Sequence, residues 1–175
     1  YYRATGGSSG SPLSVYMDFT HIARDKANTE YYMNQAGLSI FGNRSVRLYG
    51  DKIPVEAIEA GRYWYVANDR HLVMSCYHVA ESTVASYVEA IDKFEPRYIH
   101  SRPSAILPLA RYITELGLQL KVSLDGIFCD GEYLTAGQRE AIEKAFQTRV
   151  FLIYGHTEGC VMGFSCRESY ALHFP

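Results

Sequence analysis

Residues 98–116 read YIHSRPSAILPLARYITEL and contain a strand signal followed at once by a helix signal. Tyr98 and Ile99 are apolar residues that favour β-structure. After them the apolar residues recur at helical spacing and predict a helix with one inward face, made by Ile106, Leu109, Ala110, Ile113 and Leu116. The stretch therefore predicts one strand–helix unit.

The same alternation continues towards the carboxyl end. Residues 120–128 predict the next strand, and Thr135 and Gln138 have the spacing of a helix capping box. Residues 150–154 are a short apolar run, as expected for a strand buried on both faces. Strands that alternate with helices predict an α/β fold with a mostly parallel sheet, right-handed crossovers and flanking helices.

The amino-terminal half gives weaker signals. Strands are predicted for residues 13–19, 46–49 and 63–66, and helices for 20–37 and 79–94. No repeat or linker divides the chain, so one domain is predicted. The absence of an initiator Met and the abrupt end at ALHFP lead us to expect a piece of a longer protein.

Composition narrows the class of protein. The chain has 47% apolar and 21% charged residues, as in soluble globular domains, and a net charge of −2 without a basic run, which argues against nucleic-acid binding. No apolar run approaches the length of a membrane span, and no signal-peptide pattern opens the chain. Cys76, Cys129, Cys160 and Cys166 lack CxxC spacing, which favours reduced thiols and a cytoplasmic location.

A parallel sheet directs attention to the residues that follow its strands, because ligands bind beyond the carboxyl ends of such strands. The polar or Gly-bearing segments in these positions are residues 100–102, 129–132 and 154–158. Topology alone thus predicts a ligand site there.

Residues 4–12, ATGGSSGSP, form a Gly/Ser-rich loop. Glycines let backbone N–H groups converge on an anion, and hydroxyl groups add donors, so a polyphosphate could be held by Thr5, Gly6, Gly7, Ser8, Ser9 and Gly10. The loop is neither a Walker A motif nor a GxGxxG fingerprint. A flexible linker remains the alternative interpretation.

The segment YGHTE at 154–158 has matching chemistry. Tyr154 can stack on a purine, Thr157 can donate to a phosphate, and Glu158 can ligate Mg²⁺. The alternative is a strand-end turn with exposed polar residues.

TGGSSGSP and IYGHTEG, in this order, resemble the phosphate loop and the YGxTE motif of the adenylate-forming acyl-CoA synthetases and ligases. HSRPSAILPLARYI and GIFCDGEYLTAGQREAIEKAF are similar to the phenylacetate-CoA ligase branch, with its capsule-biosynthesis and coenzyme F390 synthetase homologues. The resemblance runs over essentially the whole chain. It implies an ATP- and Mg²⁺-dependent enzyme that converts a small carboxylic acid, aryl acids included, into an acyl-adenylate and then transfers the acyl group to coenzyme A.

The resemblance also implies residue roles. Thr5 to Gly10 would hold the leaving phosphates, Glu158 the metal, and Thr157 the α-phosphate. Tyr154 and Gly155 would meet the adenine, and Gly131 and Glu132 match an adenine-side segment, although no Pro follows Glu132 here. His78 matches a position that orients the acid's carboxylate; the alternative is a hydrogen-bonded structural histidine.

The resemblance makes residues 1–175 a partial N-terminal adenylation domain. The ribose-binding segment, the hinge and the C-terminal domain with the catalytic Lys are absent, so this piece is expected to be inactive by itself and its parent to be an enzyme, with a homodimer as one option. The competing hypotheses are a catalytically inactive nucleotide-binding module and a structural module.

Three smaller signals stay open. Cys166 and His173 could bind zinc, but buried thiols and a surface histidine are the simpler interpretation. The tyrosines of 31–32 and 63–65 fit an acyl pocket, the core or a dimer face. Arg102, at a predicted strand end, is either solvated or meets an anionic substrate.

Overall fold

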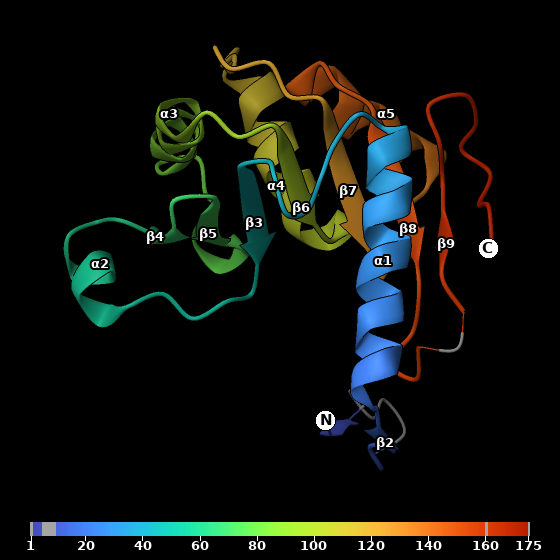
Figure 1. Ribbon diagram of the computed structural model, residues 1–175. Coiled ribbons are helices and arrows are strands. Elements are labelled where there is room, and N and C mark those ends of the chain that lie inside the picture. Colours follow the sequence, from blue (N-terminus) through green and yellow to red (C-terminus); the bar gives the residue numbers. More distant parts are fainter. Residues whose placement is uncertain (1, 5–9, 160, 175) are drawn as a thin grey trace.

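The structure is a computed structural model that describes residues 2–4, 10–159 and 161–174 (Figure 1). Its helices are α1 Phe19–Gln35, α2 Val55–Glu59, α3 Val84–Phe94, α4 Pro103–Glu115 and α5 Ala136–Phe146, with a 3-10 turn, η1, at Cys76–His78. Its strands are β1 Tyr2–Ala4, β2 Ser14–Tyr16, β3 Ser45–Tyr49, β4 Trp64–Asn68, β5 His71–Ser75, β6 Tyr98–Ser101, β7 Gly126–Asp130, β8 Val150–Tyr154 and β9 Gly163–Phe164.

Within the described part of the chain, the main sheet has seven strands in the order β4-β5-β3-β6-β7-β8-β9. The five strands from β5 to β8 in this order are parallel, and β4 and β9 add antiparallel edges. The predicted α/β fold with a mostly parallel sheet is confirmed. Strands β1 and β2 form a separate antiparallel hairpin.

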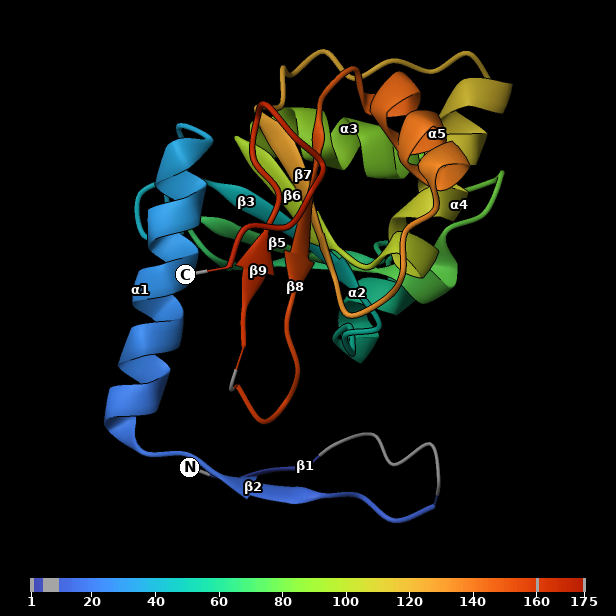
Figure 2. The ribbon, with the colours of Figure 1, turned by 90° about the vertical axis from the view of Figure 1, so that its right-hand side faces the viewer.

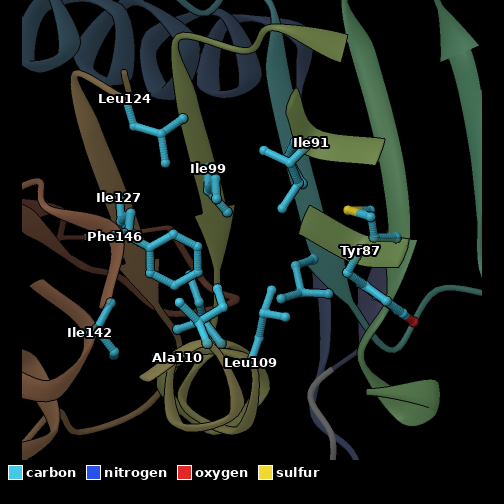
Figure 3. Packing of buried hydrophobic residues seen from close by; sticks show 14 of the residues in the cluster. Tyr87, Ile91, Ile99, Leu109, Ala110, Leu124, Ile127, Ile142 and Phe146 are labelled. Carbon is cyan, nitrogen blue, oxygen red and sulfur yellow. The ribbon is translucent and has the colours of Figure 1, made fainter. Parts of the chain in front are cut away.

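The helices divide unequally between the two faces of the sheet. Helices α3, α4 and α5 pack on one face around a large core, part of which is shown in Figure 3. Figure 2 shows α1 on the opposite face, where the buried cluster is small: Met33, Ala36, Leu38, Tyr98, Phe128 and Phe151. Alternate residues of each strand therefore enter different environments.

Three predicted boundaries were wrong for local reasons. The strand predicted for 13–19 ends at Tyr16, because the Asp18 carboxylate accepts a 2.7 Å bond from the His21 amide and caps α1. The helix predicted from residue 79 begins at Val84, after η1 and a turn held by the Thr83 hydroxyl. Leu116, predicted to face inward, follows the end of α4 and is 43% exposed.

The strand predicted for 120–128 starts only at Gly126. The Asp92 carboxylate accepts bonds from the Lys121 and Val122 amides, at 2.8 and 3.0 Å, and this holds the segment away from strand pairing. The capping box at Thr135 and Gln138 and the strand at 150–154 are confirmed. None of the helices in the described ranges has the length and apolar character needed to cross a membrane.

Candidate nucleotide and metal site

A cleft of about 470 Å³ opens at the carboxyl ends of β7 and β8. This size lies within the range of about 300–1,000 Å³ that is usual for small-molecule sites. The structure brings four predicted site residues together in its lining, which consists of Gly131, Glu132, Tyr133, Leu134, Leu152, Ile153, Tyr154, Gly155, Tyr170 and Leu172. The cleft thus stands where the strand order predicts a ligand.

Tyr154, the last residue of β8, supplies the aromatic surface of the cleft. The side chain is 49% exposed, and its ring meets Phe174 edge-on with the centroids 6.0 Å apart. A planar ligand in the cleft can therefore stack on the phenol ring.

Gly131 and Glu132 form the opposite wall of the cleft. Gly131 has φ +71°, a conformation that favours glycine, and a Cβ there would lie 3.4 Å from Arg102 Nε. The next residue, Glu132, accepts hydrogen bonds from the Ser104 amide at 2.9 Å and from the Ser104 hydroxyl at 2.7 Å. The carboxylate of Glu132 is therefore bonded to the first turn of α4.

The turn after β8 carries Glu158. Its carboxylate lies 2.9 Å from His156 Nδ1, and Thr157, between the two, is partly buried. A backbone hydrogen bond, followed by the hydrogen bond from His156, lowers the pKa of Glu158, so that the carboxylate is ionised at neutral pH. The ionised carboxylate is 35% exposed in the turn after β8, and carboxylate oxygens are ligands that Mg²⁺ prefers.

The donor set at this turn fits one kind of metal site. Among the residues that the structure describes, no group of three or more His, Cys, Asp or Glu side chains could hold a metal ion. Mg²⁺ is usually held by one or two carboxylates together with substrate phosphates rather than by a protein cage. Glu158 alone therefore fits a magnesium ion that arrives with a nucleotide.

The Glu158 turn lies against the amino-terminal segment. Glu158 shares a hollow of about 510 Å³ with Tyr16, Met17, Asp18 and His21. A Cβ at Gly159 would collide with the His21 imidazole, which shows how closely the two segments approach. The predicted phosphate residues Thr5, Gly6, Gly7, Ser8 and Ser9 lie outside the described residues, and Gly10 is exposed with φ +88°.

His78 lies far from this turn. It belongs to η1, after β5, and four strand spacings of about 4.8 Å each place it about 19 Å across the sheet from β8. Its ring stacks on Tyr63 at 4.5 Å, and its Nδ1 lies 3.0 Å from Ser75 Oγ. These contacts favour the structural alternative for His78; its role towards the acid stays a prediction.

The prediction of residue roles missed a polar cluster beside the cleft. Tyr49 donates a 2.7 Å bond to one Asp130 oxygen, and His100 Nε2 lies 3.0 Å from the other. Burial opposes ionisation of Asp130, but the hydrogen bond and charge of His100, with the Tyr49 bond and Arg102, outweigh burial and lower its pKa.

The same cluster affects Tyr49, because burial and the Asp130 carboxylate raise its pKa well above the usual range. The polar segments 100–102 and 129–132, at the carboxyl ends of β6 and β7, carried the sequence signal for His100, Arg102 and Asp130. No sequence signal pointed to Tyr49. It is the last residue of β3, and the position of β3 between β5 and β6 in the sheet cannot be inferred from chain order.

The zinc alternative gains no support in the described part of the chain. Cys166 and His173 line a shared hollow with Tyr31 and Tyr32, but no third metal-capable side chain joins them there. Cys76, Cys129 and Cys166 are free thiols, whereas Cys160 lies outside the described residues.

The chain shares the fold of CoA ligases of known structure. A long-chain-fatty-acid-CoA ligase of Archaeoglobus fulgidus superposes with a TM-score of 0.67 at 16% identity, over 97% of this chain and 34% of that one. A 2-hydroxyisobutyryl-CoA ligase bound to 2-HIB-AMP and CoA superposes with a TM-score of 0.60 at 20% identity, over 93% and 35%. No protein-family model matches the chain.

At the level of sequence, the chain is similar to Protein CapK of Staphylococcus aureus. The two are 30% identical over 156 residues, which cover 89% of this chain and 34% of that protein. The chain therefore spans about a third of the length of the proteins it matches. The resemblance to the adenylate-forming ligases, predicted from the sequence, is confirmed.

Proposed function

We propose that the chain is the nucleotide-binding part of an AMP-forming carboxylate–CoA ligase. The observation that carries the proposal is the approach of the Glu158 turn to the segment that follows the Gly/Ser loop, with both lining one hollow. The adenine-side cleft ends at Gly155, three residues before Glu158, a separation of at most about 11 Å along the chain. One extended nucleotide can therefore reach both places.

The chain's own residues then act mainly by positioning. Tyr154, with the backbone at Gly131 and Gly155, binds the adenine, and Thr157 donates to the α-phosphate. Thr5 to Gly10 hold the β- and γ-phosphates through backbone N–H groups and hydroxyls. Glu158 holds Mg²⁺, which supplies charge neutralisation for the phosphates.

In the proposed reaction a carboxylate oxygen of the acid attacks the α-phosphorus of ATP and pyrophosphate leaves. The thiol of coenzyme A then attacks the acyl carbon of the adenylate and AMP leaves. Fixed donors around the phosphates stabilise the charge that develops in the first step. The acid is a small carboxylic acid, with a phenylacetate-type aryl acid as the first candidate by resemblance, and the enzyme is cytoplasmic.

The alternative is a catalytically inactive nucleotide-binding or structural module. One observation favours this alternative. His78 lies four strands from β8 and contacts Tyr63 and Ser75, and these contacts do not support the acid-orienting role predicted for it. Pyrophosphate release by the full-length protein, measured over aryl and aliphatic acids, distinguishes a ligase from both modules.

The nucleotide site itself is tested by titrating MgATP against the thermal unfolding of the chain. Glu158→Ala and Gly7→Val should each raise the dissociation constant about tenfold, equivalent to about 1.4 kcal/mol. The first removes the proposed metal contact, and the second adds a branched side chain that would obstruct the approach of the phosphates to the backbone. Glu168→Ala, which removes an equal charge from an exposed position, is the matched control and should bind as the parent chain does.

Removal of Mg²⁺ should abolish the difference between Glu158→Ala and the parent chain. An ATP-dependent shift that neither substitution at Gly7 or Glu158 changes would reject the proposed site.

A further inference from the structure

Glu132 lines the cleft, and its carboxylate is hydrogen-bonded to the first turn of α4. Both of its oxygen atoms are engaged by one residue: Oε2 accepts from the Ser104 amide and Oε1 from the Ser104 hydroxyl. The two residues are 28 positions apart and belong to different βα units. The bond pair therefore ties the loop after β7 to the neighbouring helix.

The first turn of α4 explains why a carboxylate is stable there. Its N-cap residue, Arg102, makes no side-chain capping bond, and Pro103, the first helical residue, has no N–H group. Ser104 therefore presents the first free amide of the helix, at the end where the helix dipole is positive. Glu132 supplies from a distance the acceptor that an N-cap side chain normally provides.

The loop between β7 and α5 is held at three points. Asp130, before it, is bonded to Tyr49 and His100. Thr135, after it, forms the capping box of α5. Between these ends, Tyr133 is 86% exposed, and the bonds from Glu132 to Ser104 attach the middle of the loop to α4.

We propose that Glu132 is a positioning residue, which fixes the adenine-side wall of the cleft through Ser104 and does not itself contact the nucleotide. The inference rests on the proposed function and refines it, because the resemblance placed Glu132 among the nucleotide-contacting residues. Each carboxylate oxygen already accepts one bond from Ser104, and these two bonds hold the side chain against α4. Gly131, directly before Glu132, has φ +71°, a backbone conformation that favours glycine.

The proposal predicts a particular pattern among four variants of the chain: Ser104→Ala, Glu132→Ala, Glu132→Gln and the double variant Ser104→Ala/Glu132→Ala. Amide hydrogen exchange at Ser104 and in residues 131–134 reports the loop, and MgATP titration reports the cleft. Glu132→Ala should raise the exchange rates in both places and raise the dissociation constant for MgATP about tenfold, which is 1.4 kcal/mol. Glu140→Ala, an exposed glutamate of α5, is the matched control.

Ser104→Ala removes one of the two bonds, and Glu132→Gln keeps a neutral acceptor. The exchange rates and the MgATP dissociation constants of both variants should therefore lie between those of the parent chain and of Glu132→Ala. The double variant should match Glu132→Ala, because two groups that act through one another have non-additive effects. A silent Ser104→Ala beside a large effect of Glu132→Ala on MgATP would overturn the proposal in favour of direct nucleotide contact.

The exchange measurement separates this proposal from the proposed function. If the parent chain shows no response to MgATP, nucleotide binding by this chain fails, whereas coupled exchange at Ser104 and the loop still supports the positioning bond. If Glu132→Ala leaves exchange at both places unchanged, the positioning role is wrong even where MgATP binds.

Discussion

The two faces of the sheet are built differently although they share the same strands. On β7, Ile127 and Cys129 enter the large core under α3, α4 and α5, whereas Phe128 enters the small cluster under α1. The residue that follows on the α1 side is Asp130, bonded to Tyr49 and His100. One face therefore supplies most of the buried apolar area, and the other leaves room for polar groups near the cleft.

The two faces therefore contribute differently: one provides most of the apolar core, and the other carries the polar cluster beside the cleft. Apolar burial stabilises in proportion to the area removed from water, so the three-helix face contributes most to the folding free energy. The α1 face also carries the polar cluster of Tyr49, His100 and Asp130 near the strand ends; Figure 2 shows α1 on this face and α3, α4 and α5 on the other. Three measurements test whether the two faces differ in this way.

The largest change in the free energy of unfolding is expected when two matched buried methionines are replaced by alanine. Met74, 0% exposed, lies in the large core, and Met33, 2% exposed, lies in the cluster under α1. Met74→Ala should lower the free energy of unfolding by about 3–5 kcal/mol, and Met33→Ala by about 2–3 kcal/mol, because a single covering helix can shift to fill the cavity. Denaturant unfolding of both variants measures the difference; an equal or larger loss at Met33 would contradict it.

A smaller effect is expected at Asp130. The pKa of Asp130 in the folded chain is below the ordinary pKa of an aspartate. At a pH above that ordinary pKa the ionised carboxylate therefore stabilises the fold, and this stabilisation is lost as the pH falls through the lowered pKa. Asp130→Asn should therefore cost about 1–2 kcal/mol at pH 7, a range that allows for its partial exposure.

Acid unfolding curves check this sign, because the Asp130→Asn and parent chains should converge in stability at low pH. Asp69→Asn, at an 86% exposed side chain, serves as the control and should show little difference at any pH. A cost at Asp130 that stays constant from pH 7 down to pH 2 would show that the charge is not the cause.

The smallest effect is expected at Cys129, which is Asp130's neighbour on the other face. Burial, followed by the charges of Asp130 and Glu132, raises the pKa of its thiol to about 12. The thiol should therefore resist alkylation at pH 8 in the folded chain and react only after denaturation. Mass-spectrometric mapping of the alkylated cysteines tests this, and rapid native labelling of Cys129 would show that the large core opens readily.

The capping box, the βα alternation and the Glu158 turn could be predicted because each depends on residues close together in the chain. Thr135 and Gln138 are three positions apart, and the turn from Tyr154 to Glu158 follows its strand directly. The end of the strand at residue 16 and the late start of β7 were missed, because the carboxylates of Asp18 and Asp92 decide them by hydrogen bonding rather than by periodicity.

The amino-acid sequence was sufficient to predict the parallel α/β fold, and it directed attention to the carboxyl edge of the sheet, where the structure has its cleft. Two long-range contacts depend on the packing of the whole chain: Tyr49 meets Asp130 across 81 residues, and Glu132 binds the first turn of α4 across 28. The physical reason is that local hydrogen bonds and apolar periods are set by near neighbours, whereas strand order is set by the packing of distant segments against a common core.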